Sequence, residues 1–160
     1  MSIAPLVRPA TPADLPAMGR LGALLVEAHH QFDSQRFLAP QPGTASGYAS
    51  YLGSQLGKPD VAVLVVEVSG EVMGYAYAGV EGPDYMSLRG PAGIVYDIVV
   101  DPRFRGRGCG RLLLDATLAF LISRGAPRAV LSTAQQNEAA QRLFASAGFR
   151  RTMIEMTREL

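Results

Sequence analysis

The sequence predicts one domain of the α/β class, in which helical segments alternate with buried strands. A chain of 160 residues suits a single compact domain. Hydrophobic residues make up 48% of the chain and charged residues 18%, which is ordinary for a globular protein and argues against disordered and fibrous classes. Segments with a helical period are separated by short β-branched runs, which is typical of a sheet covered by helices. We therefore expect one domain over residues 1–160.

The expected elements follow from local patterns. Thr11, Pro12 and Asp14 supply the hydroxyl, the proline and the carboxylate that are typical of a helix start. Runs such as VAVLVVEV are β-branched and too apolar to be half exposed, which predicts strands buried on both faces. Glycines follow three of the helical segments and indicate where those helices end. The expected strands cover residues 3–8, 61–68, 71–80, 93–100, 128–133 and 150–158, and the expected helices cover residues 11–29, 44–56, 108–124 and 137–147.

Charge and cysteine content argue against several classes of function. A net charge of +1 gives no general attraction for nucleic acid or for an anionic membrane, so we expect neither as a partner. One cysteine, Cys109, cannot form an internal disulfide, and with the two histidines His29 and His30 it cannot assemble a Cys/His metal set. The sequence starts without a signal-peptide pattern, and its most apolar segment carries Asp115 and is too short to span a bilayer. We expect a cytoplasmic protein without a bound metal.

One short stretch combines arginines, glycines and a helix start. RGRGCGR, residues 105–111, lies between a buried strand that stops at Asp101 and Pro102 and an apolar helical pattern. The first amides of a helix lack partners within the helix and form its positive dipole end, and glycines let an anion approach the backbone. The stretch therefore predicts a seat for a diphosphate. Taken alone, it could also be a solvated loop whose glycines only cap the helix.

Two familiar phosphate motifs do not fit this turn. A P-loop needs a Gly-Lys-Ser/Thr ending, which is missing, so ATP or GTP with magnesium is not indicated. A dinucleotide fingerprint needs a third glycine where Arg111 stands. The spacing that fits is R-x-x-G-x-G, from Arg105 to Gly110.

Two blocks of the sequence together resemble a known family. IVVDPRFRGRGCGRLLL, residues 98–114, is similar to the strand, loop and helix that hold the CoA pyrophosphate in the GNAT superfamily of N-acetyltransferases. NEAAQRLFASAGF, residues 137–149, is similar to the N-x-x-A-x-x-L-Y-x-x-x-G-F helix of that family. The resemblance implies a GNAT fold: a twisted mixed, mostly antiparallel sheet of about seven strands with helices on both faces. It also implies acetyl-CoA as co-substrate, a small-molecule amine or a peptide or protein amino group as acceptor, and allows a homodimer.

The resemblance further implies where the cofactor lies. Its pantetheine arm is expected beside the strand at 93–100, with backbone hydrogen bonds to residues 98–100, and its diphosphate on the amides of residues 107–111. A backbone N–H near Ile98 or Val99 would polarise the thioester carbonyl, so Val99 is counted among the catalytic residues. The expected cofactor contacts are Ile98, Val99, Val100, Arg105, Gly106, Arg107, Gly108, Cys109, Gly110, Arg111, Asn137 and Phe144.

Acetyl transfer to an amine requires a base, because an alkyl ammonium with a pKa of about 10 has no lone pair with which to attack. Asp97 is the first choice, as a carboxylate within an otherwise apolar strand. It could equally be a buried structural carboxylate satisfied by a backbone N–H or an arginine. Tyr96 stands where some relatives place a catalytic glutamate. His29 and His30 are alternatives, although each could simply pack at a helix end.

The usual general acid of the family is a tyrosine, and Phe144 stands in its place. Either another hydroxyl replaces it, or the CoA thiolate leaves unaided or through water, or the protein is a sensor that binds acyl-CoA without turnover. The hydroxyls on suitable strands are those of Tyr77, Tyr96, Ser132 and Thr133. Cys109 is expected to be a small packing residue, because no histidine or asparagine is placed to activate it.

The acceptor is expected to enter beside the first two helices and the loop between them. Aromatic and charged residues are mixed there, which indicates a small polar amine or an amino-terminal residue. An interaction protein that grips RNA through the arginine cluster is a third alternative, with little aromatic interleaving to support it. The residues of this region are Phe32, Asp33, Arg36, Phe37 and Tyr48, and the expected acceptor contacts are His30, Phe32, Tyr77 and Thr133.

Overall fold

The structure is a computed structural model that describes residues 3–160. Within these residues, five strands form one sheet in the order β1-β2-β3-β4-β5. Neighbouring strands are antiparallel from β1 to β4, whereas β5 runs parallel to β4. The strands are Leu6–Pro9 (β1), Val61–Val68 (β2), Glu71–Glu81 (β3), Ala92–Val100 (β4) and Ala129–Leu131 (β5).

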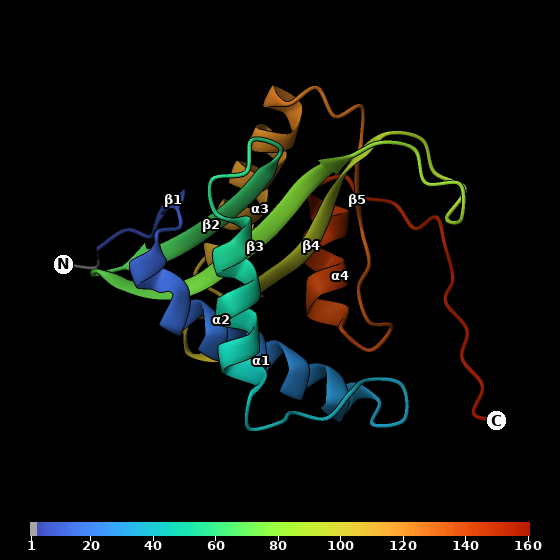
Figure 1. Ribbon diagram of the computed structural model, residues 1–160, viewed down its shortest axis with the longest axis horizontal. Coiled ribbons are helices and arrows are strands. Elements are labelled where there is room, and N and C mark those ends of the chain that lie inside the picture. The colour runs from blue at the N-terminus through green and yellow to red at the C-terminus, as the bar shows by residue number, and fades with distance from the viewer. Residues whose placement is uncertain (1–2) are drawn as a thin grey trace.

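Helices cover both faces of the sheet, as the sequence predicts. The helices α1 and α2 pack together on one face, and α3 covers the opposite face (Figure 1). The helix α4 lies beside the start of α3, where a Cβ on Gly110 would be 3.3 Å from the side chain of Leu143. The α-helices are Leu15–Phe32 (α1), Thr44–Gln55 (α2), Cys109–Ser123 (α3) and Glu138–Ser146 (α4), and short 3-10 turns cover Pro12–Asp14 and Pro102–Phe104.

The expected number of strands is wrong. About seven were expected, one of them at residues 150–158, whereas the described residues form five. Residues 150–158 leave the body as an extended segment (Figure 1), with Met153, Ile154 and Met156 at 75%, 86% and 89% exposure. The β-forming character of this segment is local, but a strand also needs a neighbouring edge, and the chain that follows the turn at residues 147–148 pairs with none of the described strands. β5 is also shorter than the predicted strand at 128–133.

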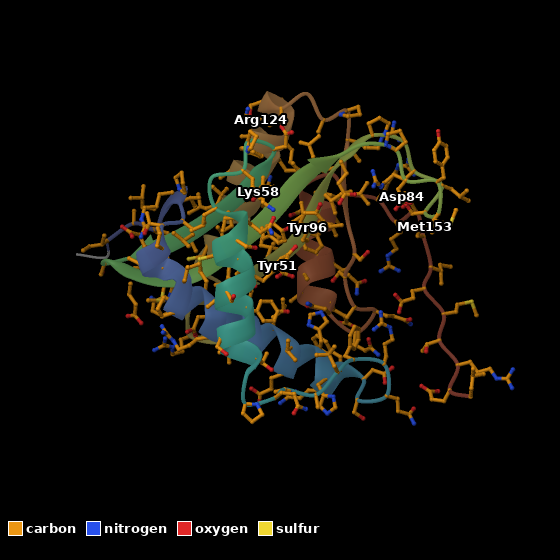
Figure 2. The ribbon with its side chains drawn as sticks, in the orientation of Figure 1. Tyr51, Lys58, Asp84, Tyr96, Arg124 and Met153 are labelled. Carbon is orange, nitrogen blue, oxygen red and sulfur yellow. The ribbon has the colours of Figure 1, made fainter. Side chains whose placement is uncertain are left out.

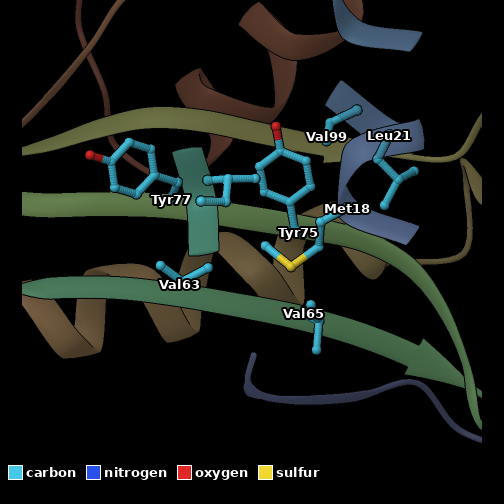
Figure 3. Close-up of a cluster of buried hydrophobic side chains, with 8 residues drawn as sticks. Met18, Leu21, Val63, Val65, Tyr75, Tyr77 and Val99 are labelled. Atoms are coloured by element: carbon cyan, nitrogen blue, oxygen red, sulfur yellow. The ribbon is translucent and has the colours of Figure 1, made fainter. Parts of the chain in front are cut away.

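The core between the sheet and the helices α1 and α2 positions several aromatic rings. Tyr75 and Tyr77 rise from the same face of β3, and Val99 of β4 and Met18 of α1 lie near Tyr75 (Figure 3). Both tyrosines are buried. Burial of a large side chain stabilises a fold by about 1.5–3 kcal/mol, so packing holds these rings in place.

Two glycines of α1 allow α2 to come close. A Cβ on Gly19 would lie 2.4 Å from the carbonyl oxygen of Ala45, and a Cβ on Gly22 would lie 2.4 Å from the ring of Tyr48. Neither position can hold a larger side chain without a shift of α2. Gly22 therefore keeps the Tyr48 ring close against α1.

An ion-pair cluster around Asp14 ties the start of α1 to the edge of the sheet. Arg8 of β1 donates to Asp14 at 2.8 Å and to Glu67 of β2 at 2.9 Å. The backbone N–H of Thr11 also donates to Asp14, at 2.7 Å, so the predicted helix start is present with a 3-10 first turn. The hydrogen bond from Arg8 lowers the pKa of Asp14 from 3.8 to about 2, although partial burial opposes this shift.

Replacement of Asp14 should destabilise the protein in a pH-dependent way. Asp14→Asn keeps the size of the side chain and removes its charge, so we expect the free energy of unfolding to fall by about 1–3 kcal/mol near neutral pH. Because folding lowers the pKa of Asp14, its contribution is complete above the unfolded value of 3.8 and disappears as the pH falls through about 2. Urea unfolding at several pH values checks this. A gap between the two proteins that stays constant on acidification contradicts it.

Candidate active site

The pairing between β4 and β5 is short and leaves an open strand edge. It runs from the pair Gly93–Ala129 to the pair Val95–Leu131, and the chain then turns away from β4. Among residues 3–160, no strand pairs with this edge of β4 from residue 96 to residue 100. The structure therefore has an open edge where the resemblance implies the pantetheine arm.

A β-bulge in β4 brings two successive side chains to one face of the sheet. Tyr77 of β3 pairs with Asp97, but the next residue, Ala78, pairs with Val95, so Tyr96 is the extra residue. The ring of Tyr96 lies 4.6 Å from that of Tyr77. Tyr96 and Asp97 therefore both lie on the α2 side, although successive side chains of a strand normally alternate.

The backbone of β4 offers alternate groups to the open edge. The N–H of Asp101 donates to the carbonyl of Met73 in β3 at 2.8 Å, which shows that the backbone of Asp101 faces β3. Because antiparallel ladders alternate, the N–H and C=O of Val99 also face β3, whereas those of Ile98 and Val100 face the open edge. Ile98 and Val100 can thus bond a ligand laid along the edge, while Val99 contributes a buried side chain.

The start of α3 forms an open cradle of backbone amides, which we define as residues 106–111. Among the described residues, no group accepts a hydrogen bond from these amides. Gly106 and Gly108 have φ values of 75° and 80°, and nothing lies within 4 Å of the position that a Cβ would take on either. A side chain there would strain the backbone and enter the cradle. Free amides at a helix N-terminus with empty space before them fit an anionic diphosphate.

The arginines of the turn are only partly free. Arg103 pairs with Asp101 at 2.8 Å, and Arg111 pairs with Asp115 at 2.9 Å. Arg105 is exposed and forms no ion pair with any residue from 3 to 160. Carboxylates of the same chain therefore offset two of the four charges, which weakens the alternative that the cluster grips RNA.

Three of the expected cofactor residues also have structural roles. Asn137 accepts a hydrogen bond from the N–H of Ala140 at 3.2 Å and so caps α4, which leaves its side-chain nitrogen to donate to a ligand. Phe144 is buried, with its ring 5.9 Å from that of Phe149. Burial raises the pKa of the Cys109 thiol, as expected for a packing residue and not for a nucleophile.

A pocket of about 460 Å³ opens on the α2 side of the bulge. We call it the acceptor pocket. Two of its tyrosines, Tyr51 of α2 and Tyr96 of β4, are labelled near the centre of the molecule in Figure 2. Its lining residues are Gly47, Tyr48 and Tyr51 of α2, Tyr77 of β3, and Tyr96 and Asp97 of β4.

Asp97 is the one carboxylate in this lining, and its surroundings make it a stronger base. Burial raises the pKa of Asp97, while the hydrogen bond from the hydroxyl of Tyr75, at 3.0 Å, and the charge of His29 lower it to a smaller extent. Within the described residues, neither an arginine nor a backbone N–H donates to Asp97. Its donor is thus a tyrosine hydroxyl, and not the backbone N–H or arginine named in the structural alternative. A carboxyl with a raised pKa is suited to accept a proton near neutral pH.

The hydroxyls of the acceptor pocket bond to one another and to nearby side chains. Tyr51 and Tyr77 share a hydrogen bond of 3.0 Å, Tyr77 donates to Gln55 at 3.4 Å, and Tyr96 donates to Glu81. Burial raises the pKa values of Tyr77 and Tyr96. Both are therefore neutral phenols near neutral pH and retain a proton to donate.

A second pocket of about 240 Å³ adjoins the acceptor pocket through Tyr48, which lines both. Apolar residues of α1 and of the loop after it form most of its wall, together with His29 and Arg36. The Nδ1 of His29 donates to the carbonyl of Leu25 at 2.8 Å. His29 is thus held with Nδ1 protonated, and its ring lies at the pocket wall.

The residues expected to contact the acceptor are only partly gathered at these pockets. Tyr77 lines the acceptor pocket. His30 lines neither pocket and donates through Nδ1 to the carbonyl of Phe37 at 3.0 Å, which ties the loop to α1. Phe32 ends α1, and Thr133 is exposed beyond β5.

Sequence reasoning missed Gly47 and Tyr51 as pocket residues. Tyr48 and Tyr51 lie three residues apart on α2 and therefore share a face of that helix. This spacing was readable in the sequence. The sheet residues that complete the pocket could not be read from the sequence, because their common face depends on the bulge at Tyr96.

Comparison with known proteins identifies the family. The model of the acetyltransferase (GNAT) family matches residues 25–149, which include the open edge of β4, the cradle and the acceptor pocket. The chain belongs to the GNAT acetyltransferase family.

Curated relatives of this GNAT protein include mycothiol acetyltransferases. That of Thermobispora bispora is 40% identical over 96 residues, which cover 58% of this chain and 31% of the relative. That of Thermomonospora curvata is 34% identical over 94 residues, which cover 59% of this chain and 29% of the relative. The matched region spans less than a third of these longer proteins.

Solved structures share the GNAT fold over nearly the whole chain. A mutant of the BH1408 protein from Bacillus halodurans has a TM-score of 0.81 at 22% identity and covers 97% of this chain and 99% of its own. The aminoglycoside N-acetyltransferase AAC(6')-Iy, solved in complex with CoA, has a TM-score of 0.75 at 17% identity and covers 100% of this chain and 96% of its own. At these identities the likeness concerns the fold.

The described part of this GNAT chain has neither a cluster of metal ligands nor a membrane-spanning helix. In the part of the chain that the structure describes, no group of three or more His, Cys, Asp and Glu side chains could hold a metal ion. No helix of residues 3–160 has the length and apolarity needed to cross a membrane.

Replacement of Gly108 should weaken the binding of acetyl-CoA. Gly108→Ala places a methyl group in the cradle and forces a side chain into a left-handed conformation that costs about 1–2 kcal/mol. Gly125→Ala is the matched control, because Gly125 has a φ of 77°, has nothing within 4 Å of its Cβ position and follows the other end of α3. We expect both variants to lose thermal stability similarly, but only Gly108→Ala to lose about tenfold or more in affinity. Calorimetric titration with acetyl-CoA measures this, and equal affinities contradict it.

Proposed function

We propose that this GNAT protein is an acetyl-CoA-dependent N-acetyltransferase that acetylates a primary amine. The observation that supports this most directly is the arrangement along β4. A cradle of free amides follows the end of the strand, an unpaired edge runs back from it, and a half-buried carboxylate stands beside that edge. These are a seat for the diphosphate, a track for an extended arm and a base near the thioester.

In this proposal the diphosphate of acetyl-CoA lies on the amides of residues 107–111. The exposed guanidinium of Arg105 is near enough along the turn to meet a further phosphate. The pantetheine arm extends along β4, where Ile98 and Val100 present their backbone groups, and Asn137 donates its side-chain N–H to an amide of the arm.

Asp97 prepares the acceptor by taking one proton from its ammonium group. The free amine then attacks the thioester carbon, the new C–N bond forms, and the bond from carbon to sulfur breaks. The nitrogen loses its second proton in this step, and that proton replaces the one taken up by the CoA thiolate. The N–H of Ile98, which faces the open edge, is placed to stabilise the carbonyl oxygen as negative charge develops on it. Val99, whose backbone faces β3, contributes its side chain to the core around Tyr75, the residue that donates to Asp97.

The CoA thiolate must take up a proton or leave without one. Phe144 cannot supply it, but Tyr77 and Tyr96 are neutral phenols at the acceptor pocket. Ser132 and Thr133 lie exposed after β5, outside both pockets. We assign the proton to Tyr77 or Tyr96, directly or through water. A thiol with a reference pKa of about 8.5 also leaves tolerably without help.

A non-catalytic sensor of acyl-CoA is the alternative. A sensor needs the cradle and the strand edge but has no use for a separate pocket that ends at a half-buried carboxylate. The acceptor pocket therefore favours transfer over sensing. Release of thiol from acetyl-CoA in the presence of a panel of amines tests the function, and binding of acetyl-CoA without thiol release by any amine supports the sensor. A cytoplasmic setting, where such a donor would be encountered, stays a prediction.

Two substitutions should separate the charge of Asp97 from its hydrogen bond. Asp97→Asn should lower the turnover number by about 10²–10⁴-fold, the usual contribution of a general base, with acetyl-CoA affinity retained. Tyr75→Phe removes the bond that lowers the pKa of Asp97, so this pKa should rise and the acid limb of the rate profile should move to higher pH. Rate profiles of both variants against pH measure this. A limb that stays in place in Tyr75→Phe, or survives in Asp97→Asn, assigns the base elsewhere.

We also propose that two copies of the chain associate through the extended segment 150–158. The segment is held to its own body by polar contacts, such as the bond from Arg151 to Gln141, while Met153, Ile154 and Met156 are exposed. Within residues 3–160, β5 pairs with β4 alone, so its outer edge is open. A second copy that lays its own segment 150–158 on the outer edge of β5 would cover the exposed apolar side chains and the open edge together.

Substitution of Ile154 should shift the protein toward the monomer. Ile154→Lys places a charge on the exposed apolar segment, and Ile122→Lys on α3 is the control, because Ile122 is 73% exposed outside it. Light scattering after size-exclusion chromatography should show a dimer for the unaltered chain and for Ile122→Lys. A monomer in all three samples contradicts the proposed association.

A further inference from the structure

The acceptor pocket combines several aromatic rings with one negative charge. Four of its six lining residues are tyrosines, and Asp97 supplies the carboxylate. The rings differ in orientation: Tyr77 is nearly perpendicular to Tyr51, at an interplanar angle of 78°, and tilted by 31° from Tyr96. The pocket therefore presents ring faces and ring edges from different directions around one carboxylate.

Three of the four tyrosine hydroxyls are already engaged, which leaves the rings for a ligand. Tyr51, Tyr77 and Tyr96 all take part in hydrogen bonds within the protein, the last to Glu81. Engaged hydroxyls do not call for the many polar groups of a sugar-like acceptor. Ring faces attract cations and apolar groups, and an ammonium over a tyrosine is a favourable contact.

The adjoining pocket adds apolar wall and no carboxylate of its own. Its lining is mostly aliphatic and aromatic, and the one lining residue with a permanent charge is the cation Arg36. Arg36 is paired with Glu155 from the C-terminal segment, and both side chains are exposed, at 38% and 67%. Glu155 lines neither pocket, and Arg36 offsets its charge, so it adds no site for a second ammonium. The linked pockets thus offer one strong site for one positive charge.

We infer that the acceptor is a primary monoamine with an aromatic or apolar body, bound as its ammonium within the tyrosines of the acceptor pocket. The inference rests on the proposed function in that Asp97 then receives the proton of this ammonium. The apolar body lies against Tyr48 and extends into the adjoining pocket. Polyamines and aminoglycosides, which carry several ammonium groups, find a single carboxylate here and are poor ligands.

Binding of a small panel of amines, measured by calorimetry without acetyl-CoA, tests the inference. The probes are 2-phenylethylamine, its uncharged analogue 2-phenylethanol, spermidine and kanamycin. We expect 2-phenylethylamine to bind at least tenfold more tightly than each of the other three. Tighter binding of spermidine or kanamycin overturns the preference for a monoamine, and equal binding of 2-phenylethanol overturns the role of the charge.

Substitution of Tyr51 separates the ring from its hydroxyl. Tyr51 is 54% exposed, so its replacement should leave the fold intact. Tyr51→Ala removes the ring and should weaken the binding of 2-phenylethylamine by about 5- to 30-fold, the range expected for a cation–π contact. Tyr51→Phe keeps the ring, and its fold loss in affinity for 2-phenylethylamine should be less than a third of that of Tyr51→Ala. Tyr85→Ala, at an exposed tyrosine outside the pocket, should bind like the unaltered protein. Equal losses in Tyr51→Ala and Tyr51→Phe overturn the inference.

These measurements are independent of the proposed function. If 2-phenylethylamine binds as expected but no amine releases CoA thiol, the pocket is assigned correctly and acetyl transfer is not. If thiol is released with polyamines faster than with any monoamine, the protein is an acetyltransferase and the inferred acceptor class is wrong.

Discussion

The early end of the pairing between β4 and β5 is the constraint on which the rest of the site depends. Three pairs of residues hold the two strands together, and beyond them β4 keeps one edge without a strand partner in the described part of the chain. An unpaired edge inside a molecule is unfavourable unless its backbone groups find other partners. An extended ligand that carries amides, laid along this edge, supplies them. The cradle follows directly after the same strand, so one interruption in the sheet gives an open edge that leads to the cradle, as the proposed binding of acetyl-CoA requires.

The bulge at Tyr96 has a second consequence, which is chemical. It places a tyrosine and a carboxylate side by side on the face covered by α2, where regular alternation would have sent one of them toward α3. Burial of Asp97 is unfavourable for its charged form, and one hydrogen bond from Tyr75 offsets only part of this. The remaining cost raises the pKa of Asp97, which favours the proposed role of proton acceptor. A fully satisfied carboxylate, such as Asp14 with Arg8 and Thr11, has its pKa lowered and would be a poor base.

Elements that depend on local pattern were predictable from the sequence, and elements that depend on distant partners were not. The strand at 61–68 and the long helix after Gly108 follow from β-branched runs and from a glycine-flanked apolar period, and both are confirmed. Residues 150–158 have a similar strand pattern but pair with no strand among the described residues. In the same way Asp97 could be singled out as a charge within an apolar strand. Tyr51 could not be placed near it, because α2 and β4 are brought together only by the bulge and by the close approach at Gly22.

The geometry of β4 also limits the kind of donor that fits. Asp97 and Asp101 are four residues apart on an extended strand, and the cradle begins a short 3-10 turn later. At about 3.3 Å per residue, the carboxylate and the end of the strand are separated by roughly 13 Å. A donor that seats its diphosphate on the cradle and presents its acyl group to Asp97 must therefore carry a long, slender arm between the two. An acyl phosphate or an acyl adenylate has its phosphate next to the reactive carbon and cannot reach both places. Coenzyme A thioesters satisfy this length requirement, and the amide groups of their arm match the open backbone groups of Ile98 and Val100.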